Sequence, residues 1–136
     1  MGNITAASEW VSEADLERRE EEWVDAVLLG ALERIEFGWE QGSFYGDGLG
    51  HAVSDEDALT FCLLGAVDAS ARALRFDFLV RSRAKRRLAL ALGKERRDDY
   101  AVWTFNDAKK RSKHEVLELL KSVISQGERH EARSLT

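Results

Sequence analysis

Apolar residues recur at the helical spacing of three and four positions along the first third of the chain. Ser12 precedes this segment and Asp15 follows three positions later, which resembles a capping box with Asp in place of Glu or Gln. The apolar positions are Leu16, Trp23, Val24, Val27, Leu28, Ala31, Leu32 and Ile35. This pattern predicts a long amphipathic helix that ends at Gly38.

A second apolar segment differs from the first because it is apolar on nearly all sides. Ser54 is followed by three acidic residues, 55–57, which suit the start of a helix. The body reads ALTFCLLGAVDASARAL, so we expect the central and most buried helix of the fold. Gly65 lies in its middle, where glycine costs about 1 kcal/mol relative to alanine. A close crossing of two helices is the expected reason for this glycine.

A third helix is predicted where apolar residues form a narrower stripe among many basic ones. The segment reads RFDFLVRSRAKRRLALALG. One face collects Val80, Ala84, Leu88 and Ala91, and Gly93 would end the helix.

Residues 94–111 are the least regular part of the sequence. The alternation over residues 100–104 is weak, and a lone strand there would have no partner. We therefore interpret this segment as a loop with a helical turn after Asn106. A full capping box follows from Ser112 to Glu115. The apolar stripe behind it predicts the last helix and consists of Val116, Leu119, Leu120 and Val123.

These elements predict an all-α fold, a compact single-domain bundle of about four main helices. The 136 residues contain no proline, so none interrupts a helix. A long connector rich in glycine and aromatic residues follows the first helix. We expect one helical domain over residues 1–136, with frayed ends at residues 1–11 and 127–136.

Composition narrows the class of protein. Hydrophobic residues make up 44% of the chain and charged residues 33%, which is typical of a soluble globular domain. No apolar run approaches the roughly 20 residues that span a bilayer, and the start of the chain lacks the pattern of a secretory signal. One cysteine permits no internal disulfide. We expect a cytoplasmic protein without a membrane contact.

Charge is distributed unevenly along the chain. Residues 1–40 carry 11 acidic and 3 basic side chains, a net charge of −8, and residues 41–80 carry −4. Residues 81–136 carry 8 acidic and 15 basic side chains, a net charge of +7. Two interpretations stay open: the opposite charges meet across helices of one fold, or they form separate faces for an acidic and a basic partner.

The stretch EFGWEQGSFYGDGLGH, residues 36–51, is rich in glycine but lacks the features of a ligand-binding loop. Its glycines follow a predicted helix instead of a strand and spell G-x-G-x-G, and no lysine is present for a phosphate loop. Leu49 and His51 occupy places where calcium would need oxygen ligands. We interpret the stretch as a connector anchored in the core by Trp39, Phe44 and Tyr45. A protein-binding loop that exposes Phe44 or Tyr45 is the alternative.

No catalytic or cofactor site is recognisable. Cys62 lies on the most apolar predicted helix, which favours a packed structural thiol, and the histidines show no zinc-ligand spacing with it. The carboxylates at 98, 99 and 107 are the nearest to an acid/base set. Basic residues flank them, so ion pairing and turn formation account for them more simply. We therefore predict a non-enzymatic protein without a metal or a cofactor.

The third predicted helix carries the strongest basic signal. Together with a later basic run it could follow a phosphate backbone, although aromatic residues do not interleave with it as a stacking surface requires. These candidate residues are Arg81, Arg83, Lys85, Arg86, Arg87, Lys109, Lys110 and Arg111. Pairing with the acidic first helix, in the same chain or in a neighbouring copy, is the simpler alternative.

Three segments in this order resemble a small bacterial and phage family of unknown function. They are GWEQG at residues 38–42, FCLLGA at 61–66, and NDA followed by SKHEV between 106 and 116. Members similarly join a Trp-x-Gln-Gly turn, a Cys-Leu-x-Gly-Ala helix and a Trp-Asn-Asp segment before a capped last helix. Here Phe105 precedes the asparagine, and Trp103 stands two positions earlier.

The resemblance implies a bacterial or phage origin, but no reaction. The polar positions that match the family are Gln41, Cys62, Asn106 and Asp107. Because a buried amide or carboxylate needs hydrogen-bond partners, these residues could tie the connector and the late turn onto the central helix.

Our leading hypothesis is a non-catalytic helical protein-interaction module, a phage or bacterial regulator or inhibitor that presents its acidic first helix to a basic partner. Glu17, Glu21 and Asp25 would contact that partner, with Phe44 and Tyr45 of the connector beside them. Homo-oligomers formed through acidic and basic complementarity are a further option. Nucleic-acid binding through residues 81–87 and 109–113 is the alternative.

Overall fold

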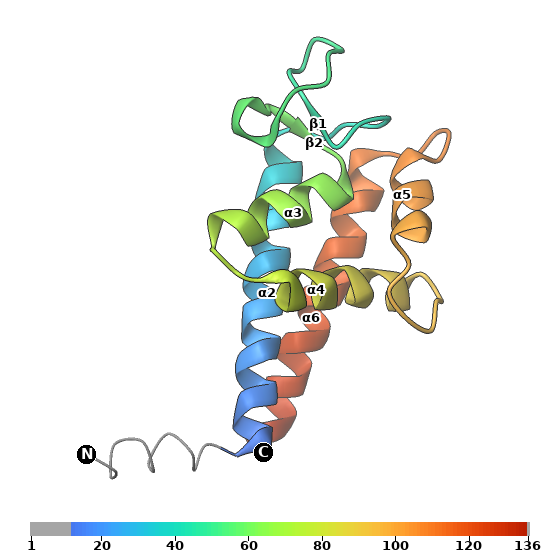
Figure 1. The fold of residues 1–136 in the computed structure, drawn as a ribbon. Helices are drawn as coiled ribbons and strands as arrows, with labels where there is room; N and C mark the ends of the chain where they lie inside the picture. The colour runs from blue at the N-terminus through green and yellow to red at the C-terminus, as the bar shows by residue number, and fades with distance from the viewer. Residues whose placement is uncertain (1–11, 136) are drawn as a thin grey trace, which may run out of the picture.

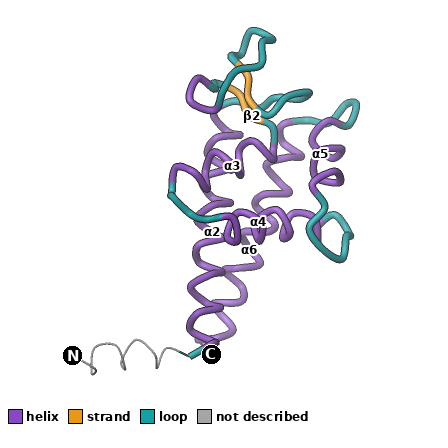
Figure 2. Tube along the Cα trace, viewed as in Figure 1, coloured by secondary structure: helices purple, strands orange, loops and turns teal. Residues whose placement is uncertain are grey.

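A computed structural model describes residues 12–135, with the side chains of residues 125–135 left aside, and its fold is mostly α-helical as predicted (Figures 1 and 2). The predicted frayed segment 1–11 lies outside the described residues. The helices are α2 (Glu13–Phe37), α3 (Leu63–Ala73), α4 (Phe78–Ala91), α5 (Asp99–Asp107) and α6 (Lys113–Leu135). Two short strands, β1 (Tyr45–Gly46) and β2 (Thr60–Phe61), and the 3-10 helix η1 (Asp55–Asp57) lie between α2 and α3.

The two long helices α2 and α6 run side by side, and the start of α2 and the end of α6 extend together beyond the other helices (Figure 1). Both predicted caps are confirmed: Ser12 Oγ accepts from Asp15 N, and Ser112 and Glu115 bond reciprocally through side chain and backbone. Lys113 Nζ also donates to the carbonyl oxygen of Glu36 at 2.7 Å, which ties the two helices together. The backbone of α6 is helical to Leu135, past the point at which the sequence predicted fraying.

Helix α2 ends at Gly38 as predicted, but the reason is space instead of a left-handed turn. Gly38 has an extended backbone, with φ −171°. A Cβ added there would lie 3.1 Å from Thr60 Cγ2 and 3.3 Å from the carbonyl carbon of Leu59. The glycine therefore lets the backbone that leads into β2 approach the end of α2.

The predicted start of the second helix at Ser54 is wrong. The acidic residues after Ser54 form η1, and α3 begins only at Leu63, with Cys62 as its N-cap. Between them β2 pairs antiparallel with β1, placing Tyr45 opposite Phe61. Pairing with β1 of the connector keeps the residues just before α3 extended. The prediction that this helix is the most buried is confirmed, because all residues from Leu63 to Ala71 are buried.

Gly65 permits a close approach, although of the connector and not of another helix. A Cβ added at Gly65 would lie 2.9 Å from the carbonyl carbon of Phe44 and closer still to its oxygen. At the same place Cys62 N donates to Phe44 O at 3.0 Å. The first turn of α3 therefore packs directly on the connector backbone.

The interpretation of residues 94–111 as a loop with a helical turn after Asn106 is also wrong. These residues include α5, which starts behind the N-cap Asp98 and ends at Asp107. Val102 and Asn106, one turn apart, are its buried residues. The preceding helix α4 ends just before Gly93 as predicted, and Gly93 has a left-handed φ of +88°.

A single apolar core joins the helices. Its buried side chains come from α2, α3, α4, α5 and α6, and the largest fully buried ones include Leu28, Ile35, Leu63, Leu88 and Leu120. Helix α3 packs across α2, and the strands of the connector lie at its start (Figure 1). The core therefore fixes the positions of the polar residues described next.

Replacing Gly65 should destabilise the fold although alanine is the better helix former. We expect Gly65→Ala to lower the free energy of unfolding by about 2 to 3 kcal/mol, because the neighbouring atoms are backbone and cannot rotate away. Urea denaturation followed by circular dichroism measures this. Gly30→Ala is the matched control, because its added Cβ meets the side chain of Ser70 instead of a backbone. A second substitution, Ser70→Ala, should therefore relieve part of the strain in that control. A stabilised Gly65→Ala variant would contradict the close approach.

Candidate functional site

The side chain of Asn106 is the centre of a buried polar hub. It is 1% exposed. Its Oδ1 accepts from Trp39 Nε1 at 2.8 Å and from Leu63 N at 3.0 Å. Its Nδ2 donates to the carbonyl oxygen of Glu40 at 3.0 Å and to Asp107 Oδ1 at 2.8 Å. One amide thus joins α5, the connector and the start of α3, and all of its hydrogen-bonding capacity is used.

Gln41 and Asp107 extend this hub to the surface. Gln41 Nε2 donates to the carbonyl oxygens of Asn106 at 2.9 Å and Ala108 at 3.1 Å. Asp107 Oδ1 accepts from Gly42 N at 3.1 Å as well as from the amide of Asn106. These bonds hold the connector against the C-terminal end of α5, where helix carbonyl groups would otherwise lack partners.

Cys62 belongs to the same region but has a structural role. Its Sγ accepts from Gly65 N at 3.3 Å and so caps α3. Burial raises the pKa of the thiol to about 11, because desolvation disfavours the thiolate. The thiol is therefore protonated at neutral pH, and reactive-cysteine chemistry finds no support in this geometry.

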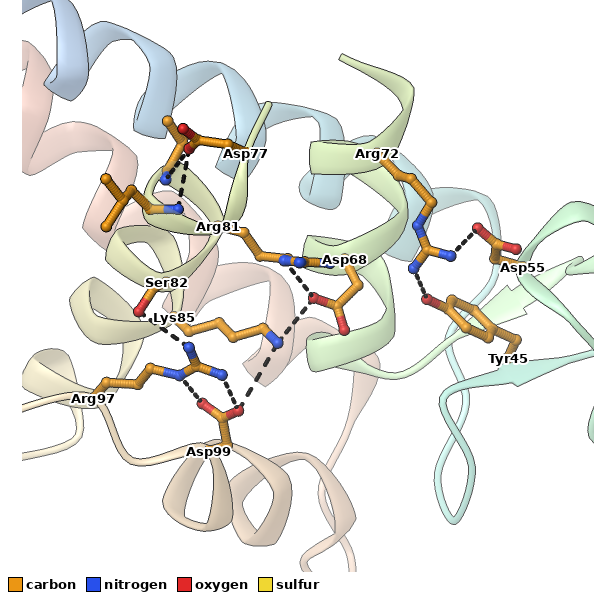
Figure 3. Close-up of polar contacts among 12 residues, drawn as sticks. Tyr45, Asp55, Asp68, Arg72, Asp77, Arg81, Ser82, Lys85, Arg97 and Asp99 are labelled. Carbon is orange, nitrogen blue, oxygen red and sulfur yellow. Dashed lines mark hydrogen bonds and ion pairs between the residues drawn. The ribbon is translucent and has the colours of Figure 1, made fainter. Parts of the chain in front are cut away.

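A second polar cluster lies where α3, α4 and the start of α5 meet (Figure 3). Lys85 is 6% exposed, and its Nζ lies 2.8 Å from Asp68 Oδ1 and 3.8 Å from Asp99 Oδ2. Arg81 Nε lies 3.8 Å from the same oxygen of Asp68. No hydrogen bond with favourable angles reaches Asp68 Oδ1 among the described residues, so Coulombic attraction holds this pair.

Asp98 and Asp99, two of the carboxylates that the sequence analysis weighed as an acid/base set, serve as a helix cap and an ion-pair partner. Arg97 donates to both oxygens of Asp99, at 2.9 and 2.7 Å, and these hydrogen bonds lower the pKa of Asp99. Arg97 Nη1 also donates to Ser82 Oγ at 3.0 Å (Figure 3). Asp98 Oδ1 accepts from Ala101 N and caps α5. The simpler account, turns and ion pairs, is the one seen here.

The basic residues of α4 face acidic residues of α2 where the two helices cross. Arg83 Nη1 lies 2.5 Å from Glu20 Oε2, and Arg87 pairs with Asp25. Arg86 is exposed on the same helix. Opposite charges from the two halves of the sequence thus meet within the chain, as the first interpretation of the charge pattern expected.

The later basic run is divided between surface and packing. Lys109 and Lys110 are exposed. The guanidinium of Arg111 instead stacks over the Phe105 ring at 3.9 Å, donates to the Phe105 carbonyl oxygen and pairs with Glu115. With Lys85 buried and Arg81, Arg83 and Arg87 paired, the eight predicted phosphate contacts do not form one free basic surface.

The acidic residues predicted to contact a partner differ in their surroundings. Glu17 is exposed, whereas Glu21 and Asp25 are half-buried. Asp25 is engaged by Arg87, and Glu21 lines a crevice between α2 and α4 together with Arg83, Arg86 and Arg87. Further exposed acids lie at Glu13 and Glu22. The exposed acidic residues are therefore densest in the first half of α2, although Glu33 and Glu36 near its other end are exposed as well.

The aromatic residues of the connector serve mainly as anchors. Phe44 is 37% exposed and packs on Trp103 of α5, with ring centroids 5.5 Å apart. Tyr45 packs edge to face on Phe61, and its hydroxyl oxygen accepts from Arg72, which also pairs with Asp55 (Figure 3). Tyr45 is therefore packed against the fold, whereas part of the Phe44 ring remains in solvent.

Sequence reasoning named Arg81, Lys85 and the carboxylate at 99 separately, but it missed Asp68 and the cluster that these residues form between α3, α4 and α5. Asp68 was visible as the sole acidic residue in an otherwise apolar helical segment. A carboxylate in such a place needs a cation, since a buried charge without a partner is costly. That signal predicts a buried basic residue but does not say that Lys85 supplies it.

Residues 19–126 match a family of unknown function, DUF6197. The chain belongs to this family. No match was found among curated proteins, and no solved structure matches. The four polar positions of the sequence resemblance, Gln41, Cys62, Asn106 and Asp107, all lie within the part of the chain that DUF6197 covers and meet at or beside the hub.

Two further findings concern the described part of this DUF6197 chain. Among its helices none has the length and apolar character needed to cross a membrane. Its histidine, cysteine and carboxylate side chains nowhere gather in a group of three that could hold a metal ion.

Removing the hub amide should be costly. We expect Asn106→Ala to lower the free energy of unfolding by about 3 kcal/mol or more, because Trp39 Nε1, Leu63 N and the Glu40 carbonyl lose buried partners. Gln41→Ala is the matched control: it removes two bonds nearer the surface and should cost about 1 kcal/mol. Chemical denaturation measures both, and equal losses would contradict the central role of Asn106.

Removing the buried cation should likewise destabilise the protein. Lys85→Met should lower the free energy of unfolding by about 3 kcal/mol, because Asp68 is left buried with only the more distant Arg81. Adding Asp68→Asn should recover much of this loss. Arg86→Met, on the exposed side of the same helix, should change stability by less than about 0.5 kcal/mol. Thermal unfolding of the wild type and of these three variants measures the changes. Equal stability of Lys85→Met and Arg86→Met would contradict the buried pair.

Proposed function

We propose that this protein is a non-catalytic helical interaction module that binds a basic surface of a protein partner through the first half of α2. The carrying observation is the position of the acidic residues. Residues 13–22 contain six acidic side chains and two arginines, and they lie where α2 and α6 extend beyond the other helices (Figure 1). A concentrated charge on a projecting element is well placed to steer a partner of opposite charge.

The density of acidic residues supports this location over the rest of α2. Glu20 and Asp25 pair with arginines of α4. Glu13, Glu17 and Glu22 are exposed within ten residues, whereas the rest of α2 exposes only Glu33 and Glu36. The neighbouring end of α6, residues 125–135, contains two glutamates and two arginines, so its sequence adds no net charge there. Glu13 and Glu17, four residues apart on one side of α2, therefore define the acidic surface proposed for the partner.

The resemblance described above supports a more specific proposal. It suggests that the module acts in a bacterium or a phage, as a regulator or inhibitor of its partner. A cytoplasmic location is proposed with it, since the single cysteine is buried and serves as a helix cap. Association of two copies through acidic and basic surfaces remains a further proposal.

Nucleic-acid binding is the weaker proposal. A phosphate-binding surface needs several free cations in a row. Of the candidate residues, Arg83, Arg86, Lys109 and Lys110 are exposed, but Arg83 pairs with Glu20, and Lys85 is buried. The favoured function therefore rests on the acidic surface.

Charge reversal on that surface tests the proposal. We expect a variant carrying Glu13→Lys and Glu17→Lys to recover at least about tenfold less partner at low salt, because attraction becomes repulsion. The measurement is affinity capture from the native host with quantitative mass spectrometry. Raising the salt concentration should reduce capture by the wild type in the same direction.

The matched control reverses two exposed glutamates elsewhere, Glu95 and Glu118, to lysine. It has the same change in net charge and should retain the partner. Circular dichroism confirms that both variants fold. Equal capture by the wild type and the α2 variant would contradict the proposal, and equal loss in both variants would show that net charge alone is sensed.

A further inference from the structure

A shallow apolar groove lies between α2 and the end of α3. It lies on the side of α2 away from the acidic residues that pair with α4. It is lined by Ala26, Leu29, Gly30, Ser70, Ala73 and Leu74, with Glu33 and Arg34 at its edge. It encloses about 290 Å³. Ligand pockets usually span roughly 300–1,000 Å³. The groove therefore suits one or two side chains of a partner better than a whole small molecule.

Close helix packing makes the floor of this groove rigid. Ser70 Oγ donates to the Val27 carbonyl oxygen at 2.8 Å, which fixes α3 against α2. A side chain at Gly30 would displace Ser70, because an added Cβ would lie 3.2 Å from Ser70 Cβ and closer to its hydroxyl. The groove is thus formed in advance, which lowers the ordering cost of binding.

The walls of the groove are apolar and accessible. Leu29 is 47% exposed and Leu74 is 46% exposed. Near one end the half-exposed ring of Trp23 packs on Phe76, with centroids 5.7 Å apart. Large apolar side chains that stay half in solvent on facing elements are typical of a surface that a partner covers.

Charge beside the groove indicates the chemistry of that partner. Glu33 is exposed at the edge, four residues after Leu29, and Glu22 is exposed four residues before Ala26. Residues four apart lie on the same side of a helix, so these carboxylates flank the apolar floor along α2. Arg34 turns back to its own helix, where Nη1 donates to the Gly30 carbonyl oxygen at 3.1 Å. The two acids leave a negative border.

We propose that this groove binds a basic amphipathic helix of a protein partner. Apolar side chains of that helix, leucine or phenylalanine one turn apart, would lie between Leu29 and Leu74. Lysine or arginine residues beside them would face Glu22 and Glu33. This is the helix-in-groove mode of recognition. The inference rests on the proposed function and adds to it the place and the form of the partner segment.

The test uses two synthetic peptides of identical composition. Each has about 16 residues of leucine and lysine, in one case with the leucines at i, i+3, i+4 and i+7, and in the other scrambled around the helix. Fluorescence polarisation with labelled peptides measures binding to the full chain. We expect the amphipathic peptide to bind at least about tenfold more tightly than the scrambled one.

Variants then separate the groove from the acidic surface. Leu29→Gln and Leu74→Gln should each weaken the amphipathic peptide about tenfold and leave the scrambled peptide unchanged. Leu49→Gln, at an exposed leucine in the connector, is the matched control and should change neither. Amide chemical shifts of Ala26, Gly30 and Ala73 should move on titration with the amphipathic peptide in the wild type.

The outcomes are distinguishable. Equal affinity for the two peptides, or full binding by Leu29→Gln, overturns the groove. If the reversal of Glu13 and Glu17, which leaves Glu22 at the groove unchanged, still abolishes partner capture in that case, the proposed function stands without the groove. Absence of binding by either peptide at low salt, together with unchanged capture by the reversal variant, overturns both.

Discussion

The arrangement of this domain depends on one buried amide. Asn106 links the carbonyl of Glu40, the indole of Trp39 and the first backbone N–H of α3, three groups that come from two distant stretches of chain. An unsatisfied buried donor or acceptor costs about 1–3 kcal/mol, so displacement of any one segment penalises the others. The close contact of the connector with Gly65 and the pairing of β1 with β2 both require this placement. A connector with little helix of its own is thereby tied to both α3 and α5.

Charge pairing explains how an acidic protein accommodates a basic helix. Lys85 is enclosed between Asp68 and Asp99, and Arg83 and Arg87 meet acids of α2. Several basic residues of the C-terminal half thus form ion pairs that hold α4 against α2, α3 and α5. Buried pairs of this kind give little net stability, yet breaking one is costly, so they specify how the helices cross. The acidic residues beyond this crossing are the ones that remain available for a partner.

The sequence predicted the elements whose information is local and missed those that depend on distant partners. The helices α2 and α6 were found because their apolar spacing and their caps at Ser12 and Ser112 lie within the elements themselves. The start of α3 was missed because the acids after Ser54 resemble a helix start. Their actual conformation is set by pairing of β2 with β1, some 15 residues away in sequence. Helix α5 has nine residues, too few to display a clear stripe, and its fixed points are the Asp98 cap and the inward pair Val102 and Asn106.

The four polar residues on which the sequence resemblance rests belong to the scaffold. Gln41, Cys62, Asn106 and Asp107 form hydrogen bonds within the fold. The functions that we propose are therefore placed on the surface. Both proposed surfaces lie on α2, the acids in its first turns and the groove from Ala26 to Glu33. At 1.5 Å per residue, the distance from Glu13 to Glu33 is roughly 30 Å. A single partner helix would need about 20 residues to use both, so a shorter partner must choose one of them.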